Sequence, residues 1–110
     1  MADVLVIGGA SAVHELHARY AAIDRVAVAR LAPEVVALPP ELRRAAFHEA
    51  VQHLLPGGLL VHTPHPEFDA LAVEFDLRPP TDDDVAAWPT CRVWRRTTRT
   101  TVHDLVHEAR

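Results

Sequence analysis

Lysine is absent from this sequence, which carries no chemical conclusion, and cysteine occurs only once. A single cysteine, Cys91, allows neither an internal disulfide nor a cysteine-rich zinc site. Long apolar runs are also missing, whereas a bilayer-spanning helix needs roughly 20 apolar residues in a row. The first residues lack the basic start of a secretory signal peptide. We therefore expect a cytoplasmic protein with no membrane segment.

The charge balance argues against nucleic acid as a partner. The 110 residues carry a net charge of −4 with the eight histidines counted as neutral, so the protein has no overall positive field for phosphates or anionic lipids. One local basic strip places Trp94 among Arg92, Arg95, Arg96 and Arg99. We interpret this strip as a solvated strand edge, which is equally a candidate for pairing with a second subunit.

Four short apolar stretches predict β-strands, at residues 4–7, 26–28, 34–38 and 59–61. The first and last are apolar at every position, which is typical of strands buried on both faces of a parallel sheet. Too few residues separate the second stretch from the third for a parallel crossover, which needs about a dozen. Either the second strand runs antiparallel, or the second stretch is not a strand, or two chains exchange segments in a dimer.

Helices are predicted where apolar residues recur with the helical period. A first helix follows Ser11, which can cap it. The clearest helix begins at Pro39-Pro40 and is expected to end at Gly57, because proline suits the first helical turn and glycine the residue after the last. Another helix opens at Pro66. The apolar face of the first helix is formed by Val13, Leu16 and Tyr20.

The final segment, from Cys91 onwards, permits two interpretations. Strands at residues 91–97 and 101–108 would form a hairpin, although the turn between them lacks the glycine or asparagine typical of hairpins. Alternatively, Thr101 and Asp104 make a capping box for a final helix. The apolar residues of that helix would be Val102, Leu105 and Val106. The sequence leaves both interpretations open.

The order of these elements predicts an α/β protein, because strands alternate with helices along most of the chain. We expect one domain over residues 1–110, with an open, mostly parallel, Rossmann-like sheet. A chain of this length supports barely one hydrophobic core.

The segment 47–61 is similar to a landmark of class I S-adenosylmethionine-dependent methyltransferases. In that family a helix and a leucine-x-proline-glycine-glycine turn lead into the fifth strand, and this chain has Leu54-Leu55-Pro56-Gly57-Gly58 there. The resemblance covers residues 34–110 and implies a shortened methyltransferase-like fold with a C-terminal antiparallel hairpin. Further matching segments are residues 34–38 (fourth strand), 66–77 (the helix after the fifth strand), and 92–96 with 102–108 (the closing antiparallel pair).

The same family binds its cofactor in a glycine-rich loop after the first strand, which corresponds to residues 4–12. The resemblance implies that the cofactor is cradled by Gly8, Gly9 and Ser11. Val6 stands where the family has an acidic residue, and Ala10 and Ala12 replace two glycines, so two methyl groups occupy the place of the cofactor's methionine part. The acidic residue that binds the ribose after the second strand is also missing, and Asp24 or Glu34 would have to supply it.

A second group of candidate residues follows the strand at 59–61. His62 and His65 come after its carboxyl end, where ligands gather in open α/β sheets, and either could act as an acid or base near a methyl acceptor. A polar loop is the plainer interpretation. The eight histidines fall into the pairs His14/His17, His48/His53, His62/His65 and His103/His107. Zinc needs three or four ligands, so the pairs favour hydrogen-bonded or surface histidines, and we assign no metal.

Two functions are consistent with these features. The altered cofactor loop favours a non-catalytic, degenerate methyltransferase-like domain that acts as an oligomerising or partner-binding module, as a homodimer or with another protein. The alternative is a small S-adenosylmethionine-dependent methyltransferase acting on an unknown small molecule or peptide. S-adenosylmethionine is the one cofactor that the sequence suggests.

Overall fold

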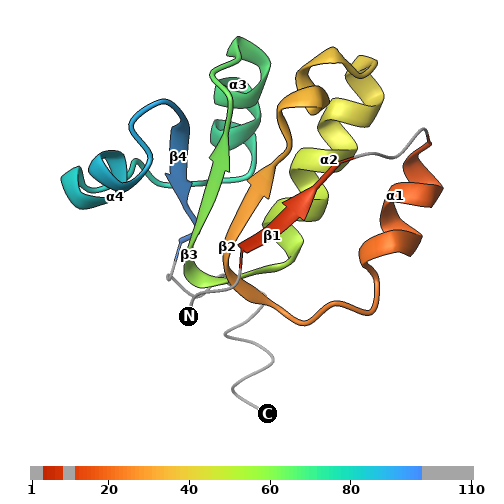
Figure 1. Cartoon of the computed structure of the whole chain (residues 1–110), viewed down its shortest axis with the longest axis horizontal. Helices are drawn as coiled ribbons and strands as arrows, with labels where there is room; N and C mark the ends of the chain where they lie inside the picture. The colour runs from red at the N-terminus through yellow and green to blue at the C-terminus, as the bar shows by residue number, and fades with distance from the viewer. Residues whose placement is uncertain (1–3, 9–11, 98–110) are drawn as a thin grey trace.

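The computed structural model describes residues 4–8 and 12–97, which form a sheet with helices packed against it (Figure 1). The strands are β1 (Val4–Ile7), β2 (Val26–Leu31), β3 (Leu54–His62) and β4 (Arg92–Arg95). The helices are α1 (Val13–Tyr20), the 3-10 helix η1 (Pro33–Ala37), α2 (Pro40–Gln52), α3 (Pro66–Glu74) and α4 (Asp82–Ala87).

The strands lie in the order β1-β2-β3-β4. β1, β2 and β3 are parallel, and β4 runs antiparallel to β3. The prediction of an α/β protein with an open, mostly parallel sheet is therefore confirmed. The second strand of the predicted hairpin, residues 101–108, lies outside the described residues.

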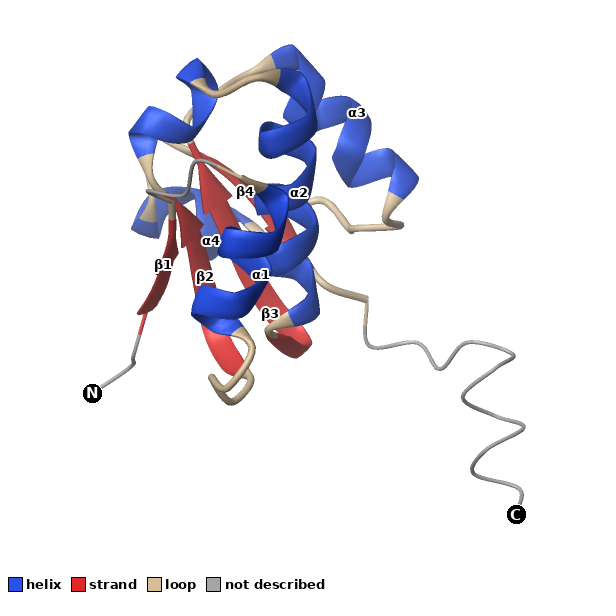
Figure 2. Cartoon of the chain, turned by 90° about the vertical axis from the view of Figure 1, so that its right-hand side faces the viewer, coloured by secondary structure: helices blue, strands red, loops and turns tan. Residues whose placement is uncertain are grey.

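Three helices cover the same face of this sheet. Each parallel strand pairs with the next one along the chain, and both crossovers advance in the same direction across the sheet. Because such crossovers are right-handed, the connecting helices fall on one side. Figure 2 shows α1, α2 and α3 together on that side of the strands.

The main core lies between the sheet and these helices. Its largest members are Phe47 of α2 and Phe68 of α3, both with no exposed surface. Their rings stack with centroids 5.7 Å apart, and Phe47 also stacks on Phe75 at 5.8 Å. The sheet contributes Ile7, Ala29, Leu31, Leu54 and Leu60.

The predicted strand at residues 34–38 is wrong, because residues 33–37 form the 3-10 helix η1. Val35 and Val36 favour a strand locally, but Pro33 suits the start of a helical turn. The buried side chain of Val35 points into the core from this turn. The second stretch is a strand, β2, and runs parallel to its neighbours, so an antiparallel or missing second strand is wrong. η1 and α2 together make the crossover to β3 within one chain.

The predicted helix end at Gly57 is also wrong. α2 ends at Gln52, with His53 as its C-cap, and β3 begins at Leu54. Gly57 lies within β3 with φ of 80°, a conformation that favours glycine. It belongs to the irregular stretch where the pairing with β2 jumps from Val26–Leu54 to Val28–Leu59.

Candidate functional site

The carboxyl ends of β1, β2 and β3 meet at one edge of the sheet, as the parallel arrangement requires. Of the residues expected there to hold a cofactor, Gly9 and Ser11 lie outside the described residues. Gly8 follows β1 directly, and a methyl group on it would lie 2.8 Å from Cβ of Ala32 and 3.3 Å from Oε1 of Glu34. A glycine is therefore required here by close packing against the end of β2.

Both backbone polar groups of Gly8 are already engaged by α1. The N–H of Gly8 donates to the hydroxyl of Tyr20 at 3.1 Å, and its carbonyl oxygen accepts from Nη1 of Arg19 at 2.9 Å. Tyr20 is buried, and its hydroxyl also lies 3.1 Å from the carbonyl oxygen of Val6. These bonds fasten α1 to the end of β1, so Gly8 does not fit the role of a backbone donor to S-adenosylmethionine.

His62 is completely buried at the end of β3. Its Nδ1 lies 2.7 Å from the carbonyl oxygen of Thr63 and therefore carries the proton that donates to it. Its Nε2 accepts from the indole N–H of Trp94 at 2.9 Å. The ring also packs against Phe47 and Phe68. Both nitrogens are thus occupied within the chain, and a role in acid or base chemistry would require these bonds to break.

Burial lowers the pKa of His62 below its ordinary value of 6.5. The folded protein therefore holds the neutral ring, whereas the unfolded chain takes up a proton as the pH falls below 6.5. We expect the stabilisation that depends on neutral His62 to be complete above that pH and to be lost as the pH falls toward the folded-state pKa. This one group contributes a slope of at most about 1.4 kcal/mol per pH unit.

Urea denaturation at pH values between about 5 and 7, where carboxylates stay ionised, measures this slope. His62→Gln serves as the control, because glutamine retains polar atoms and does not titrate. The variant should show a shallower decline in the free energy of unfolding. Equal slopes in the two proteins would contradict the assignment of a neutral, buried His62.

His65 has a local structural role. It is the N-cap of α3, and its Nδ1 accepts from the backbone N–H of Glu67 at 3.2 Å. This bond satisfies one of the free N–H groups of the first helical turn. The acid or base role expected for His62 and His65 stays a prediction.

The carboxylate of Glu49 joins two histidines, His17 of α1 and His53 at the end of α2. Oε1 of Glu49 lies 3.2 Å from Nδ1 of His17, and Oε2 lies 3.1 Å from Nε2 of His53. Glu49 and His53 are buried. Within residues 4–8 and 12–97, no three histidine, cysteine, aspartate or glutamate side chains are placed to hold a metal ion. The pair His103/His107 lies outside those residues.

The arginines of the predicted basic strip are engaged by the chain itself. The guanidinium of Arg92 lies over the Trp94 ring at 5.4 Å and bonds to Asp69 at 3.2 Å. Arg95 pairs with both carboxylate oxygens of Asp84 at 2.8 Å. Arg96 donates to the carbonyl oxygen of Leu54. Arg99 lies outside the described residues.

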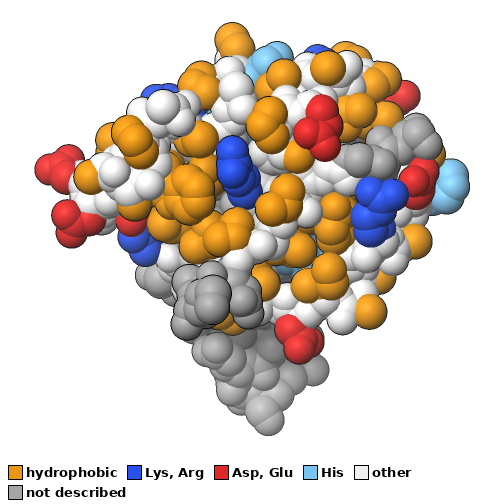
Figure 3. Space-filling view, viewed as in Figure 1, with side chains coloured by type: hydrophobic (Ala, Val, Ile, Leu, Met, Phe, Trp, Pro, Cys, Tyr) orange, Lys and Arg blue, Asp and Glu red, His pale blue; other side chains and the backbone are white. Residues whose placement is uncertain are grey.

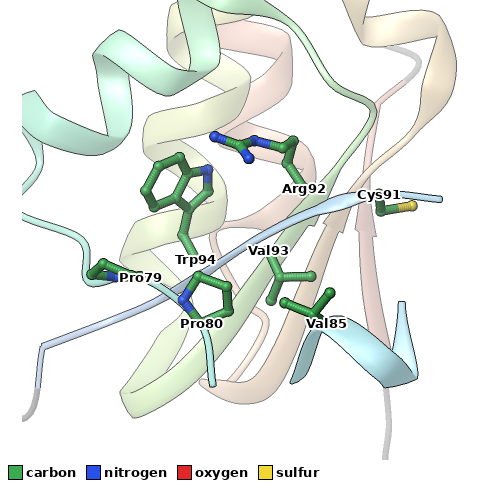
Figure 4. A pocket seen from close by; sticks show the side chains of 7 residues that line it. All are labelled: Pro79, Pro80, Val85, Cys91, Arg92, Val93 and Trp94. Atoms are coloured by element: carbon green, nitrogen blue, oxygen red, sulfur yellow. The ribbon is translucent and has the colours of Figure 1, made fainter. Parts of the chain in front are cut away.

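A pocket of about 310 Å³ lies beside β4 (Figure 4). Its lining is apolar apart from Arg92, and it includes Pro79, Pro80 and the thiol-bearing Cys91. Figure 4 shows Trp94 and Arg92 on one side of β4, with Val93 facing Val85 of α4 on the other. The lining residues offer no acid–base pair for catalysis.

The most distinctive surface is the sheet face turned away from α1, α2 and α3, which we call the open face. The strand register places two rows of side chains on it, Val4-Val28-Leu59-Arg95 and Val6-Arg30-Val61-Val93. Figure 3 shows hydrophobic side chains gathered over the strands on this face, with few charged groups among them. The sequence did not reveal this face, because the all-apolar strands predicted burial on both sides.

Coverage of the open face is uneven. At the β4 side, Val61 and Val93 are buried and the ion pair between Asp84 and Arg95 attaches α4. α4 itself begins with a capping box between Thr81 and Asp84. At the β1 side, Val4 keeps 40% and Val6 keeps 50% of their surface exposed. The uncovered part of the open face therefore lies over β1 and β2.

Arg30 stands in the middle of this apolar surface. It pairs in register with Val6 on one side and Val61 on the other, and it is partly buried. Within the described residues, its guanidinium makes no hydrogen bond or ion pair. A cation with an apolar surround and no partner favours binding of a carboxylate.

No family model, curated protein or solved structure matches the chain. No helix in the described part of the chain is long and apolar enough to cross a membrane.

Proposed function

We propose that this protein is a non-catalytic, methyltransferase-like module that binds a protein partner through its open face. One observation carries the proposal: the three parallel strands have α1, α2 and α3 on one face, and the part of the other face over β1 and β2 leaves apolar side chains exposed. Parallel sheets normally have both faces covered. The missing cover is then supplied by another polypeptide.

The expected partner is an amphipathic helix. A helix is the element that usually covers a parallel sheet, and its apolar stripe would bury Val6, Val28 and Leu59. Full burial of one such side chain contributes about 1.5–3 kcal/mol. A carboxylate beside the stripe would meet Arg30, which fixes the register and selects against basic helices. The homodimer expected from the sequence is the case in which a second copy provides the helix.

The methyltransferase-like ancestry is supported by the order of elements around β3. The helix α2 precedes it, the Pro56-Gly57-Gly58 turn lies within its first residues, and α3 follows. This is the arrangement that the resemblance implies for the fifth strand. The engaged backbone of Gly8 supports loss of the cofactor site.

A methyltransferase remains the second candidate, and one contact favours it. The carboxylate of Glu34 lies beside Gly8, where an acidic residue for the ribose hydroxyls would be needed. Glu34 is exposed and lies in the first turn of η1, so a ligand at the carboxyl edge could contact it.

A charge-reversal experiment tests the partner-binding proposal. Two synthetic helical peptides would carry the same leucine stripe, one with glutamate beside it and one with lysine. We expect the full chain to prefer the glutamate peptide by about fivefold in Kd, which corresponds to about 1 kcal/mol for a partly exposed ion pair. Fluorescence anisotropy measures both affinities.

The variant Arg30→Glu should reverse the preference. Arg44→Glu, a change of the same kind on α2 at the opposite side of the sheet, should leave it unchanged. Equal affinities of both peptides for the wild-type protein and for Arg30→Glu would contradict a docking site centred on Arg30.

A further inference from the structure

Within the described residues, the outer edge of β4 is paired at Arg95 alone. The backbone N–H of Arg78 donates to the carbonyl oxygen of Arg95 at 2.7 Å, and the N–H of Arg95 donates to the carbonyl oxygen of Arg78 at 2.9 Å. Because proline has no backbone N–H, the next two residues, Pro79 and Pro80, cannot continue this pairing in the same way. The segment therefore leaves β4 after one paired residue.

This arrangement leaves the backbone of Val93 without a partner. Successive residues of an antiparallel strand direct their N–H and C=O groups to opposite edges. Arg95 bonds outwards, so Val93, two residues before it, directs both groups outwards as well. No hydrogen bond in the described part of the chain uses these groups, although Val93 is only 5% exposed. Because nearly all buried backbone groups are paired in native proteins, this free donor and acceptor indicate a place for a ligand.

A pocket adjoins these unpaired groups. Val93 is one of the residues that line the cavity of about 310 Å³ beside β4 (Figure 4). The rings of Trp94, Pro79 and Pro80 supply apolar surface in the same lining. Small-ligand sites range from about 300 to 1,000 Å³ and combine an apolar lining with a few polar groups. The cavity lies at the small end of that range, so we expect a small ligand.

Arg92 supplies the one charge in the pocket lining. Its Nε bonds to Asp69 at 3.2 Å, and its two terminal nitrogens make no hydrogen bond within residues 4–8 and 12–97. The ion pair with Asp69 is at the surface, with about half of each side chain exposed, so it contributes little energy. The guanidinium is therefore able to bind a second carboxylate, one that belongs to a ligand in the pocket.

The unpaired stretch of β4 is too short for a strand. The N–H of Cys91 donates to the carbonyl oxygen of Trp88 at 3.1 Å, and the outer groups of Arg95 are taken by Arg78. Strand pairing needs bonds at every second residue, so a strand from a second copy, paired at Val93, would meet these occupied positions. A ligand that offers one donor and one acceptor matches the single free residue.

We propose that this pocket binds an acylated amino acid with an apolar side chain and a free carboxylate. The amide N–H of the ligand donates to the carbonyl oxygen of Val93, and the carboxylate accepts from the N–H of Val93 and from Arg92. The apolar side chain packs against Trp94. An acylated nitrogen fits better than a free ammonium group, which would lose its hydration beside the charge of Arg92.

Two sources of this ligand share the same chemistry, a free small molecule and the C-terminal residue of a peptide. The inference goes beyond the proposed function, because it concerns a different surface. β4 and β1 lie at opposite edges of the sheet, whereas the uncovered part of the open face lies over β1 and β2.

NMR spectroscopy of the ¹⁵N-labelled full chain tests the site. N-acetyl-L-leucine, titrated to millimolar concentration, should shift the backbone amide signal of Val93 and the indole signal of Trp94 in a saturable way. N-acetyl-L-leucinamide has the same shape without the carboxylate, and we expect it to bind about fivefold more weakly. No saturable shift of the Val93 amide with either compound would overturn the proposal.

Matched variants locate the binding. Val85→Trp fills the pocket from a side chain that is 50% exposed, and Val13→Trp makes the same change at a residue of α1 that is 49% exposed. Val85→Trp should weaken binding of N-acetyl-L-leucine at least about tenfold, whereas Val13→Trp should bind it as the wild-type protein does. Arg92→Gln should bind the acid and the amide equally. An unchanged affinity in Val85→Trp would contradict binding in this pocket.

Alkylation of Cys91 gives a second readout and separates the two sources of the ligand. Cys91 is the single cysteine of the chain and lines the pocket, so its reaction with iodoacetamide, followed by mass spectrometry, reports whether the pocket is occupied. N-acetyl-L-leucine should slow this reaction. Equal protection by an octapeptide that ends in leucine would assign the pocket to peptide ends, and protection by N-acetyl-L-leucine alone would assign it to a free small molecule. Protection by neither would overturn the proposal.

Discussion

Phe47→Ala is expected to lower the free energy of unfolding by about 3–5 kcal/mol, the usual cost of truncating a buried phenylalanine. Phe47 has no exposed surface, and its ring packs against Phe68, Phe75 and His62. Truncation removes the contact through which α2 packs against both β3 and α3. Because small domains are stabilised by only about 5–15 kcal/mol, the variant should be partly unfolded at physiological temperature.

Urea denaturation followed by circular dichroism measures the loss. Val73→Ala is the matched control, because Val73 leaves 78% of its surface in water and should change the stability by less than about 0.5 kcal/mol. A loss below about 1 kcal/mol for Phe47→Ala would mean that the aromatic cluster is not the centre of the core.

Val6→Asp is expected to weaken binding of the glutamate peptide by about a hundredfold without destabilising the free protein. Val6 is half exposed and pairs in register with Arg30 on the open face. An aspartate there would pair with Arg30 in the free protein and remove the cation from the incoming helix. Lost apolar burial and the cost of desolvating the new carboxylate add to about 3 kcal/mol, which corresponds to the hundredfold change.

The control for this change is Val13→Asp. Val13 leaves 49% of its surface exposed, almost the same as Val6, but it lies on α1 at the opposite side of the sheet. Its affinity for the peptide should match that of the wild-type protein, measured by anisotropy at equal temperature and salt. A similar loss in both variants would indicate a general effect of added negative charge and would contradict docking at the open face.

The helices were the most predictable part of the fold. The apolar period and an opening proline located α2 and α3, since Pro40 and Pro66 begin these helices. The same period identifies the side chains that these helices bury, because Phe47 and Phe68 lie on the apolar faces that pack together. Such local signals are strong because they repeat over several turns.

Two predictions about strands and their boundaries failed because of the packing around each segment. Residues 34–38 contain two valines, but the chain after β2 must turn at once to leave the sheet, so Val35 reaches the core from a 3-10 turn. Glycine is common just after the end of a helix, but Gly57 lies inside β3, where it adopts a positive φ. In both cases tertiary packing overrides a local preference.

The open face was beyond sequence reasoning for a topological reason. Every residue of β1 is apolar, which predicts cover on both sides, and only the strand order shows that α1 and α2 fall on the same side. Arg30 was the one available signal, since an arginine between buried Ala29 and Leu31 must point away from the main core. The hydrogen bonds of His62 to Thr63 and Trp94 likewise depend on contacts that residue spacing does not reveal.

The most direct test of the account is one calorimetric experiment on the full chain with two kinds of ligand. S-adenosylmethionine and S-adenosylhomocysteine would be titrated to millimolar concentration, and the glutamate peptide would be titrated into the same protein. We predict saturable heat with the peptide and none with either nucleoside. Saturable binding of S-adenosylmethionine, with a rise in Tm that follows its concentration and no binding of the peptide, would contradict the account and identify the carboxyl edge near Gly8 and Glu34 as the functional site.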